Sequence, residues 1–395
     1  MTQTGTTSLY LDHNASSIVA HECIEVMLQS LRSGVGNPSS LHTPGARASR
    51  LIEDARGKVA DLMGAMPREI VFTCSGTEAN HAAILGILAQ RVGPRQVVTS
   101  AVEHPSTLML LRHLEKSGVR VSYCPVDGQG RLSVEAVMNA ISSDTVLVTV
   151  MWANNETGVL FPIAEIVALA HARGVIVHTD AVQAAGKIPI DLGRVPVDLL
   201  SLSSHKLYAP PGSGALFVRK GLQITPLLWG HQERRLRGGT PNGPAIVAFG
   251  RACALVKEGL DRDSARMRAL RDRLERGIMA LCPHAYVHGR DAPRLPNTSN
   301  IGFAGLQGEE LQDAFNKNGV AVSTGAACVA GGMEPSHVLM AMGLGRRQAL
   351  SAIRFSFGRY NTEADVTVVL EILPDILREV ASRRHGSAER GLGFS

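Results

Sequence analysis

Short apolar runs alternate with amphipathic stretches between residues 69 and 218. The apolar runs are rich in β-branched residues, which predicts buried parallel strands, and the amphipathic stretches between them predict crossover helices. The predicted strands are 69–73, 96–100, 120–124, 145–151, 175–179, 199–203 and 214–218, and the predicted helices are 77–90, 106–116, 134–141 and 163–172. The pattern therefore predicts an α/β fold with a mainly parallel sheet flanked by helices, in which ligands bind at the carboxyl ends of the strands.

The pattern changes after the last of these strands. A polar stretch rich in Gly and Pro, 230–244, precedes a predicted helix at 245–276 that leads into a smaller α+β region. The elements predicted there are strands at 300–303, 320–323 and 353–356 and helices at 308–318 and 362–378. The predicted domains are a large domain over 14–250, a smaller domain made of 1–13 and 251–380, and a flexible tail over 381–395.

The composition is that of an ordinary globular protein: of 395 residues, 45% are hydrophobic and 19% are charged. The basic residues behind the net charge of +5 are scattered, so no nucleic-acid partner is expected. Six cysteines lie far apart and never form a CxxC pair, which favours free thiols over a metal site or disulfides. With no leader pattern and no apolar run of membrane-spanning length, we expect a cytoplasmic protein that does not contact a membrane.

Three strand ends carry residues suited to one kind of chemistry. Gly76 and Thr77 follow a strand through small residues, so the next helix either offers its N-terminus to a phosphate or is simply capped there. Asp180 ends another strand, where it caps a helix or faces a cationic ligand nitrogen. Lys206 follows an apolar strand, and burial there would lower its pKa and make the amine a Schiff-base nucleophile. An anion site, an acid and a lysine are what an enzyme supplies to pyridoxal 5'-phosphate.

A series of short motifs makes a resemblance specific. The motifs are Tyr-Leu-Asp at 10–12, Gly-Asn-Pro-Ser-Ser at 36–40, Ser-Gly-Thr-Glu at 75–78, Glu-His at 103–104, Ala-Asn-Asn-Glu-Thr-Gly at 153–158, His-Thr-Asp-Ala-Val-Gln at 178–183, Ser-Ser-His-Lys at 203–206, Gly-Gly-Thr at 238–240, Gly-Ala-Ala-Cys at 325–328 and Ile-Arg-Phe-Ser at 353–356. In this order they resemble the NifS/IscS-type cysteine desulfurases. These belong to the class V aminotransferase superfamily, which has the type I fold of pyridoxal phosphate enzymes.

The resemblance implies roles for the residues at the strand ends. Lys206 would form a Schiff base with the cofactor, and Asp180 would pair with its ring nitrogen. His104 would stack on the ring and assist proton transfer, and Gln183 would bond the phenolic oxygen. The residues implied to hold the phosphate are Gly76, Thr77, Ser203 and His205, together with a Thr240 contributed by the second subunit of a homodimer.

The resemblance also implies where the substrate binds. Asn155 would orient cofactor and substrate, and Arg354 would bind the substrate carboxylate through a bidentate fork. Cys328 lies among small residues and would be the nucleophile that receives sulfur. The remaining cysteines are expected to be packing residues.

The implied activity is that of a homodimeric cysteine desulfurase. It would convert L-cysteine to L-alanine and leave sulfur on Cys328 as a persulfide for a sulfur-acceptor protein, as in iron–sulfur cluster assembly or thiolation of tRNA or cofactors. A selenocysteine lyase or another pyridoxal phosphate-dependent C–S lyase is the alternative. A protein that binds the cofactor without turnover is a second alternative, which the presence of Lys206, His104, Asp180 and Arg354 disfavours.

Overall fold

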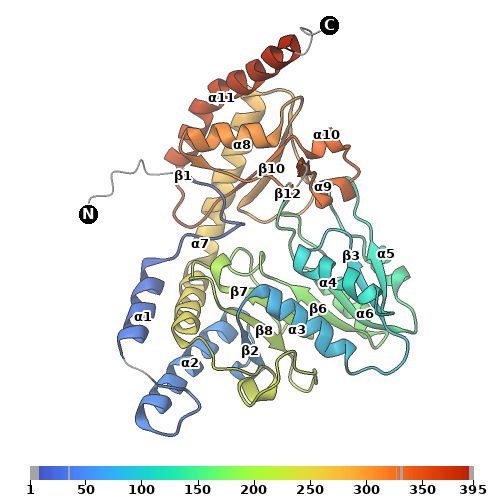
Figure 1. Ribbon diagram of the computed structural model, residues 1–395, viewed down its shortest axis with the longest axis vertical. Coiled ribbons are helices and arrows are strands. Elements are labelled where there is room, and N and C mark those ends of the chain that lie inside the picture. Colours follow the sequence, from blue (N-terminus) through green and yellow to red (C-terminus); the bar gives the residue numbers. More distant parts are fainter. Residues whose placement is uncertain (1–8, 34–35, 326, 330–331, 391–395) are drawn as a thin grey trace.

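A seven-stranded sheet forms the centre of the larger half of the molecule in this computed structural model (Figure 1). The structure describes residues 9–33, 36–325, 327–329 and 332–390. The strands of this sheet are β2 (Ile70–Thr73), β3 (Gln96–Ser100), β4 (Arg120–Cys124), β5 (Thr145–Met151), β6 (Ile176–Asp180), β7 (Leu199–Ser203) and β8 (Gly214–Val218). They agree with the predicted strands to within one residue at each end.

The sheet is mainly parallel. Its strand order is β2-β8-β7-β6-β5-β3-β4, and every neighbouring pair from β7 to β4 is parallel. Only β8 runs antiparallel to its neighbours, β2 and β7. Parallel strands place their carboxyl ends at one edge, so the loops after β5, β6 and β7 lie together. The predicted fold class, an α/β fold with a large mainly parallel sheet and a smaller α+β part, is confirmed.

Helices cover both faces of this sheet because successive side chains of a strand point to opposite sides. Val71 packs into the core on one face, whereas its neighbours Ile70 and Phe72 pack into the core on the other. The first face is covered by α3 (Gly76–Leu88) and α4 (Pro105–Glu115), and the second by α2 (Thr43–Leu62), α5 (Val134–Ala140), α6 (Ile163–His171) and the first half of α7 (Gly243–Leu281). The sheet is therefore packed between two layers of buried apolar side chains, and these layers fix the positions of the strand ends.

A second hydrophobic core lies in the smaller half of the molecule and is built around a three-stranded sheet with the strand order β14-β10-β9 (Figure 1). Its strands are the antiparallel β9 (Ala285–Val287), β10 (Thr298–Phe303) and β14 (Ala352–Ser356), and its helices are α8 (Gly308–Lys317), α11 (Glu363–Arg390) and the second half of α7. Leu11 from the N-terminal segment is buried in the same core. Helix α7 contributes to both cores, so the predicted boundary near residue 250 falls inside a continuous helix. The division into domains stays a prediction.

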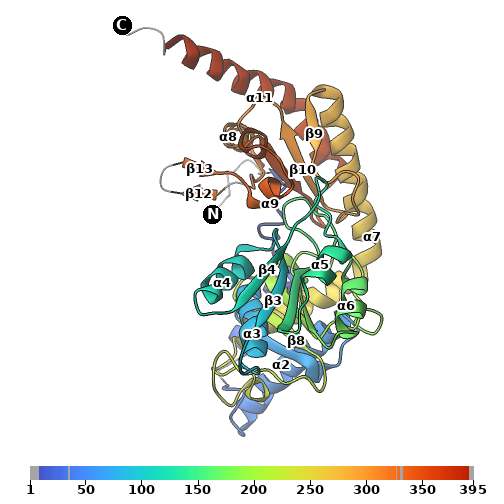
Figure 2. The same ribbon diagram turned by 90° about the vertical axis from the view of Figure 1, so that its right-hand side faces the viewer.

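Several elements were not predicted from the sequence. They are β1 (Leu9–Tyr10), β9, the antiparallel pair β12 (Ala327–Val329) and β13 (Gly332–Glu334), and helices α1 (His21–Arg32), α2, α9 (His337–Ala341) and α10 (Arg346–Ala349). The strand predicted at 320–323 is present as the shorter β11 (Val320–Ala321). Figure 2 shows β12 and β13 projecting from the side of the smaller half. Helix α11 continues to Arg390, past the predicted helix end at residue 378 and into the range 381–395 for which a flexible tail is predicted. Residues 391–395 lie outside the described part of the chain.

The cysteines are mostly packing residues, with one exception. Cys23, Cys124 and Cys253 are buried free thiols, as predicted. Cys74 is instead exposed, because it lies in the turn between β2 and α3 rather than inside either element. Across the described ranges, the structure contains no helix with the length and apolar character needed to cross a membrane.

A buried ion pair ties α2 to the loop that follows β8. The guanidinium of Arg56 donates to both carboxylate oxygens of Glu233, over 2.7 and 2.8 Å, and both side chains are about 5% exposed or less. Glu233 also accepts from the backbone N–H of Phe72 in β2, and Arg56 donates to the carbonyl of Ile70. Each charge is therefore fully hydrogen-bonded in place, which a buried pair requires.

Removing one partner of this pair should destabilise the protein strongly. We expect Glu233→Ala to lower the free energy of unfolding by about 3 kcal/mol, because Arg56 would lose its buried partner and, among the described residues, keep an ion pair only with the exposed Glu53. The matched control is Asp54→Ala, which breaks the exposed Lys58–Asp54 pair and should cost about 1 kcal/mol or less. Urea unfolding followed by circular dichroism measures both, and equal effects of the two variants would contradict the expectation.

Candidate active site

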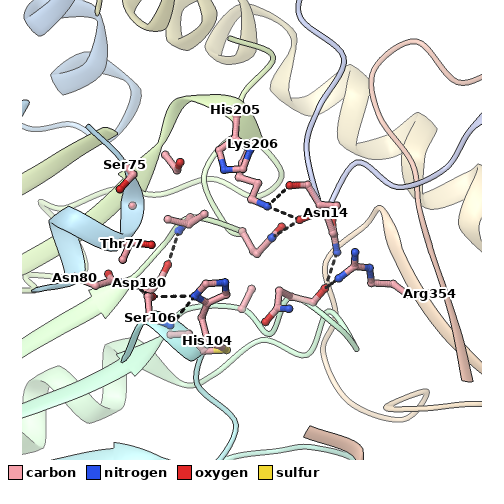
Figure 3. A pocket seen from close by; sticks show the side chains of 18 residues that line it. Asn14, Ser75, Thr77, Asn80, His104, Ser106, Asp180, His205, Lys206 and Arg354 are labelled. Atoms are coloured by element: carbon pink, nitrogen blue, oxygen red, sulfur yellow. Dashed lines mark hydrogen bonds between the residues drawn. The ribbon is translucent and has the colours of Figure 1, made fainter. Parts of the chain in front are cut away.

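A cavity of about 360 Å³ opens where the carboxyl ends of the parallel strands meet (Figure 3). Its size lies within the range of about 300–1,000 Å³ that is usual for small-molecule sites. The predicted site residues that line it are Gly76, Thr77, His104, Asn155, Asp180, Gln183, Ser203, His205, Lys206 and Arg354. Residues far apart in the sequence, from both halves of the molecule, thus converge on one cavity. Thr240 and Cys328 are the predicted site residues that do not line it in the described part of the chain.

Lys206 lies at the centre of this cavity, at the end of the short turn η2 (Ser204–Lys206) that follows β7. Its ammonium nitrogen donates to the carbonyl oxygens of Asn14 and Ala15, over 2.6 and 2.5 Å. Burial lowers the pKa of Lys206 to about 8, and the positive charge of Arg354 acts in the same direction. The amine is therefore far easier to deprotonate than an ordinary lysine.

One side of the cavity is built to bind an anion. Ser75 caps α3 by accepting from the N–H of Glu78, and the first N–H groups of the helix, those of Gly76 and Thr77, have no acceptor within it. A Cβ on Gly76 would lie 2.9 Å from the side chain of Val182, which follows β6. Glycine at this position therefore allows the start of α3 to lie close to the end of β6. Ser203 and His205 line the same cavity. A helix N-terminus with added donors is a favourable phosphate site.

A chain of hydrogen bonds connects Asp180 to His104. Asp180 Oδ2 accepts from Asn80 Nδ2 over 2.7 Å, and the same amide group donates to the hydroxyl of Ser106 over 3.0 Å. Ser106 in turn lies 2.8 Å from His104 Nδ1. Partial burial lowers the pKa of His104, with Asp180 opposing that shift. The network orients the carboxylate and the imidazole on neighbouring walls of the cavity (Figure 3).

Arg354 lies on the side of the cavity away from Thr77, with Lys206 between them (Figure 3). Its Nη2 donates to Asp12 over 2.7 Å and its Nη1 to the carbonyl oxygen of Asn155 over 3.1 Å. The side chain is buried, and its Nε has no hydrogen-bond partner. Since each terminal nitrogen carries a second N–H, the guanidinium is oriented and retains donors for a carboxylate.

Asn14 is a central residue of the site that the sequence did not single out. Its carbonyl oxygen accepts from Lys206 Nζ and from Gln183 Nε2, and its side-chain amide donates to the carbonyl of Asn155. Gln183 is held from behind by the buried Lys187, which donates to its backbone and side-chain oxygens. An asparagine in a loop gives no chemical signal in the sequence, so only the fold could identify it.

Asp12, Asn80 and Ser106 were likewise missed as site residues. Asp12 belongs to the Tyr-Leu-Asp motif, and Asn80 lies one helical turn after Gly76, so it faces the same side of α3. These two positions carried a signal that the sequence analysis did not use. Ser106 follows Pro105 at the start of α4 and passes for an ordinary helix-start residue.

Burial favours the uncharged forms of several groups around the site. It raises the pKa of Glu103 to about 8 and lowers that of His205 to about 4. His178, which lies beneath the site between Thr149 and Ser201, has its pKa lowered to about 3 by the same cause. Apart from its histidines, the acidic and basic residues that line the cavity are Lys206, Arg354 and Asp180, and Asp12 pairs with Arg354 from outside the lining.

The two predicted residues outside the cavity lie on separate segments. Thr240 is exposed and lines a second hollow together with Leu31, which is 59% exposed. A contribution from Thr240 to the site could therefore come only from another copy of the chain or from a rearranged loop. Cys328 lies in β12, where it pairs in register with Met333 of β13. Its side chain lies outside the described part of the structure.

Comparison with known proteins identifies the family. The family model described as aminotransferase class-V matches residues 9–369. The chain belongs to this family. It is 46% identical over 394 residues to a cysteine desulfurase of Gluconacetobacter diazotrophicus, covering 98% of each chain. It is 44% identical over 374 residues to the cysteine desulfurase NifS of Azotobacter vinelandii, covering 94% of this chain and 93% of the relative.

Solved structures of family members agree with the fold. A NifS-like protein superposes with a TM-score of 0.88 at 36% identity, covering 94% of this chain and 99% of that one. SspA, solved in complex with cysteine, gives a TM-score of 0.80 at 34% identity, covering 90% of this chain and all of its own, 100%. The resemblance to NifS-type cysteine desulfurases inferred from the motifs is thus confirmed.

The low pKa of Lys206 can be measured directly. In the cofactor-free protein we expect competitive acetylation of Lys206 to rise with a midpoint near pH 8, about two units below the value of about 10.4 for a free lysine side chain. The sign follows from burial, which disfavours the cation, so the reactive neutral amine forms at lower pH. Nα-acetyl-lysine, whose ε-amine is free, serves as the reference in the same solution. Peptide mass spectrometry locates the label. A midpoint equal to that of the reference would contradict the expected pKa.

Proposed function

We propose that this protein is a pyridoxal phosphate-dependent cysteine desulfurase that transfers the sulfur of L-cysteine to Cys328. In the overall step, the C–S bond of cysteine breaks and an S–S bond to Cys328 forms, and the remaining three-carbon unit leaves as L-alanine. The observation that carries the proposal is the position of Lys206, whose partly buried amine lies in the cavity between the N-terminus of α3 and the buried Arg354. The curated relatives of the same family support the choice of reaction.

The residues present fit the cofactor. The helix N-terminus at Gly76 and Thr77, with Ser203 and His205, would hold the phosphate, and Asp180 would face the ring nitrogen. Lys206 would hold the aldehyde carbon. When bound, pyridoxal phosphate supplies an electron sink that weakens the bonds at the α- and β-carbons of an amino acid.

The protein's own residues provide binding and proton transfer. Arg354 would bind the substrate carboxylate, since its guanidinium is already oriented by Asp12 and by the carbonyl of Asn155. Near neutral pH, the amine of Lys206 exchanges a proton readily because its pKa lies close to the ambient pH. His104 is held by Ser106 on an adjacent wall, where its imidazole can accept or return a second proton.

The nucleophile and the sulfur acceptor are separate parts of the proposal. Cys328 is carried on the β12–β13 hairpin of the smaller half rather than on the large sheet. We infer that its thiolate attacks the substrate sulfur and then offers the persulfide to an acceptor protein. The free thiols of the described chain suit a reducing compartment, which supports a cytoplasmic location.

A homodimer is the proposed assembly. Thr240 and the exposed Leu31 line one hollow on the surface of the larger half. We infer that a second subunit covers this hollow and receives Thr240 at its phosphate site. Such a two-fold interface would complete both sites at once.

Replacing Cys328 should separate cysteine desulfurization from lyase activity. We expect Cys328→Ser to keep the yellow colour of the cofactor complex and to release alanine from L-cysteine at least about a hundredfold more slowly, because a hydroxyl is a poor nucleophile toward sulfur. Alanine release is measured with L-cysteine and with selenocysteine, using Cys282→Ser as the control. Wild-type turnover of L-cysteine by Cys328→Ser would instead identify a C–S lyase, and unchanged use of selenocysteine alone would identify a selenocysteine lyase activity beside it.

Mixed dimers test the contribution of Thr240. Lys206→Ala and Thr240→Val subunits should each be nearly inactive alone, the second through weak cofactor binding. In an equal mixture that exchanges subunits at random, we expect about one quarter of wild-type activity, because half of the dimers carry one intact site. Alanine formation and the cofactor content of the separated species are measured. Full activity of a monomer, or no recovery in the purified heterodimer, would contradict the shared site.

A further inference from the structure

Glu156 is a buried carboxyl that the proposed chemistry does not use. It follows Asn155 in the turn after β5 and is 5% exposed. The turn is rigid, because Asn154 Oδ1 accepts from the N–H groups of both Glu156 and Thr157, over 2.9 and 3.0 Å. Burying a carboxyl group is unfavourable unless it has a specific partner, so its contacts indicate what it does.

Within the described residues, the Glu156 carboxyl group contacts the segment that carries Cys328 at two points. Ser336, just after β13, donates a short hydrogen bond from its hydroxyl to Glu156 Oε2. Gly325, just before β12, lies so close that a Cβ there would be 2.1 Å from the same oxygen and 3.0 Å from the Cβ of Ser336. The carboxyl group thus touches the chain at the two ends of the β12–β13 hairpin.

A second contact strengthens the end after β13. His337, next to Ser336, donates from Nε2 to the carbonyl oxygen of Glu103 over 2.9 Å. Ser336 also caps α9 by accepting from the N–H of Leu339. The end of the hairpin is therefore bound to the loop after β3, which leads to His104, as well as to the loop after β5. Neither contact involves the strands that pair Cys328 with Met333.

We propose that Glu156 is a positioning residue, which binds Gly325 and Ser336 together and thereby sets where the hairpin holds Cys328 relative to the cavity. Its neighbour Asn155 provides the other half of the connection, since the Asn155 carbonyl accepts from Arg354 and from Asn14. The turn that contains Asn155 and Glu156 therefore holds both Arg354, which we propose binds the substrate carboxylate, and the two ends of the β12–β13 hairpin. Burial raises the pKa of Glu156, while Ser336, His337 and Arg354 act against that shift.

This inference rests on the proposed role of Cys328, and it predicts a specific pattern in variants of the holoenzyme. Glu156→Ala should increase amide hydrogen exchange of residues 325–336 about tenfold, because the buried hydrogen bond from Ser336 is lost. The rate of alanine formation should fall by a similar factor, while KM for cysteine and the cofactor absorbance stay within about twofold of wild type. Glu156→Gln keeps an acceptor for Ser336 and should retain most of the protection and the rate.

A double-mutant cycle distinguishes the contact from general damage. Ser336→Ala removes the same hydrogen bond, so its effect on exchange and rate should not add to that of Glu156→Ala. Because Ser336→Ala also removes a helix cap, Ser133→Ala is the matched control: Ser133 caps α5 by accepting from Ala136, away from the hairpin. This control should leave the exchange of 325–336 unchanged.

The possible outcomes separate the two proposals. Additive effects, or exchange of 325–336 that stays within about twofold of wild type in both Glu156→Ala and Ser336→Ala, would overturn the positioning role. If Glu156→Ala does not fold, Glu156→Gln with Ser336→Ala decides the matter by the same exchange measurement. If the wild-type protein forms no alanine from cysteine, the proposed function fails, yet the exchange experiment still tests the contact of Glu156 with the hairpin.

Discussion

The site depends on the hydrogen bonds of Asn14. Its backbone carbonyl accepts from Lys206 and Gln183 of the larger half, while its side chain and N–H bond to Thr298 and Ser356 of the smaller half. A short N-terminal segment thereby lies between the two cores and satisfies polar groups of both. The carbonyl oxygens of Asn14 and Ala15 hold the partly buried amine of Lys206 in one orientation. Without them the amine would be buried and unpaired, which is strongly unfavourable.

The charges around Asn14 make the cavity suited to a ligand that carries phosphate and carboxylate groups. Burial lowers the pKa of Lys187 to about 7, and the positive charges of Lys206 and Arg354 act in the same direction; Arg354 likewise adds to the effect of burial on the pKa of Lys206. Asp12 and Asp180 offset part of this charge at two separate points. The phosphate and carboxylate of bound ligands would supply the remaining negative charge, so binding relieves repulsion already present in the protein.

The sequence predicts those parts of the site that belong to strand ends. Asp180, Lys206 and Gly76 follow short apolar runs, and a parallel sheet necessarily brings such ends together, so the fold class and these positions could be predicted in advance. Asn14 and Asn80 could not be predicted by chemistry alone, because amides in loops and helix starts serve many structural purposes. Helices α1 and α2, which pack against α7, have a clear amphipathic pattern and could also have been predicted. The β12–β13 hairpin could not, because the pairing of only a few residues forms it.

The placement of the nucleophile follows from the chemistry it would perform. Groups that bind a cofactor must hold fixed positions, and those proposed here, among them Asp180 and Lys206, lie at the edge of the large sheet, which is covered on both faces. A thiol that takes sulfur from a substrate and offers it to another protein has to meet two partners in turn, which a side chain on that rigid edge could not do. A hairpin on the smaller half meets this need, provided that its ends are fixed to the site. Glu156 would supply that attachment from the same turn that orients Arg354, so the proposed binding of the substrate and the reach of Cys328 would depend on one short segment of the chain.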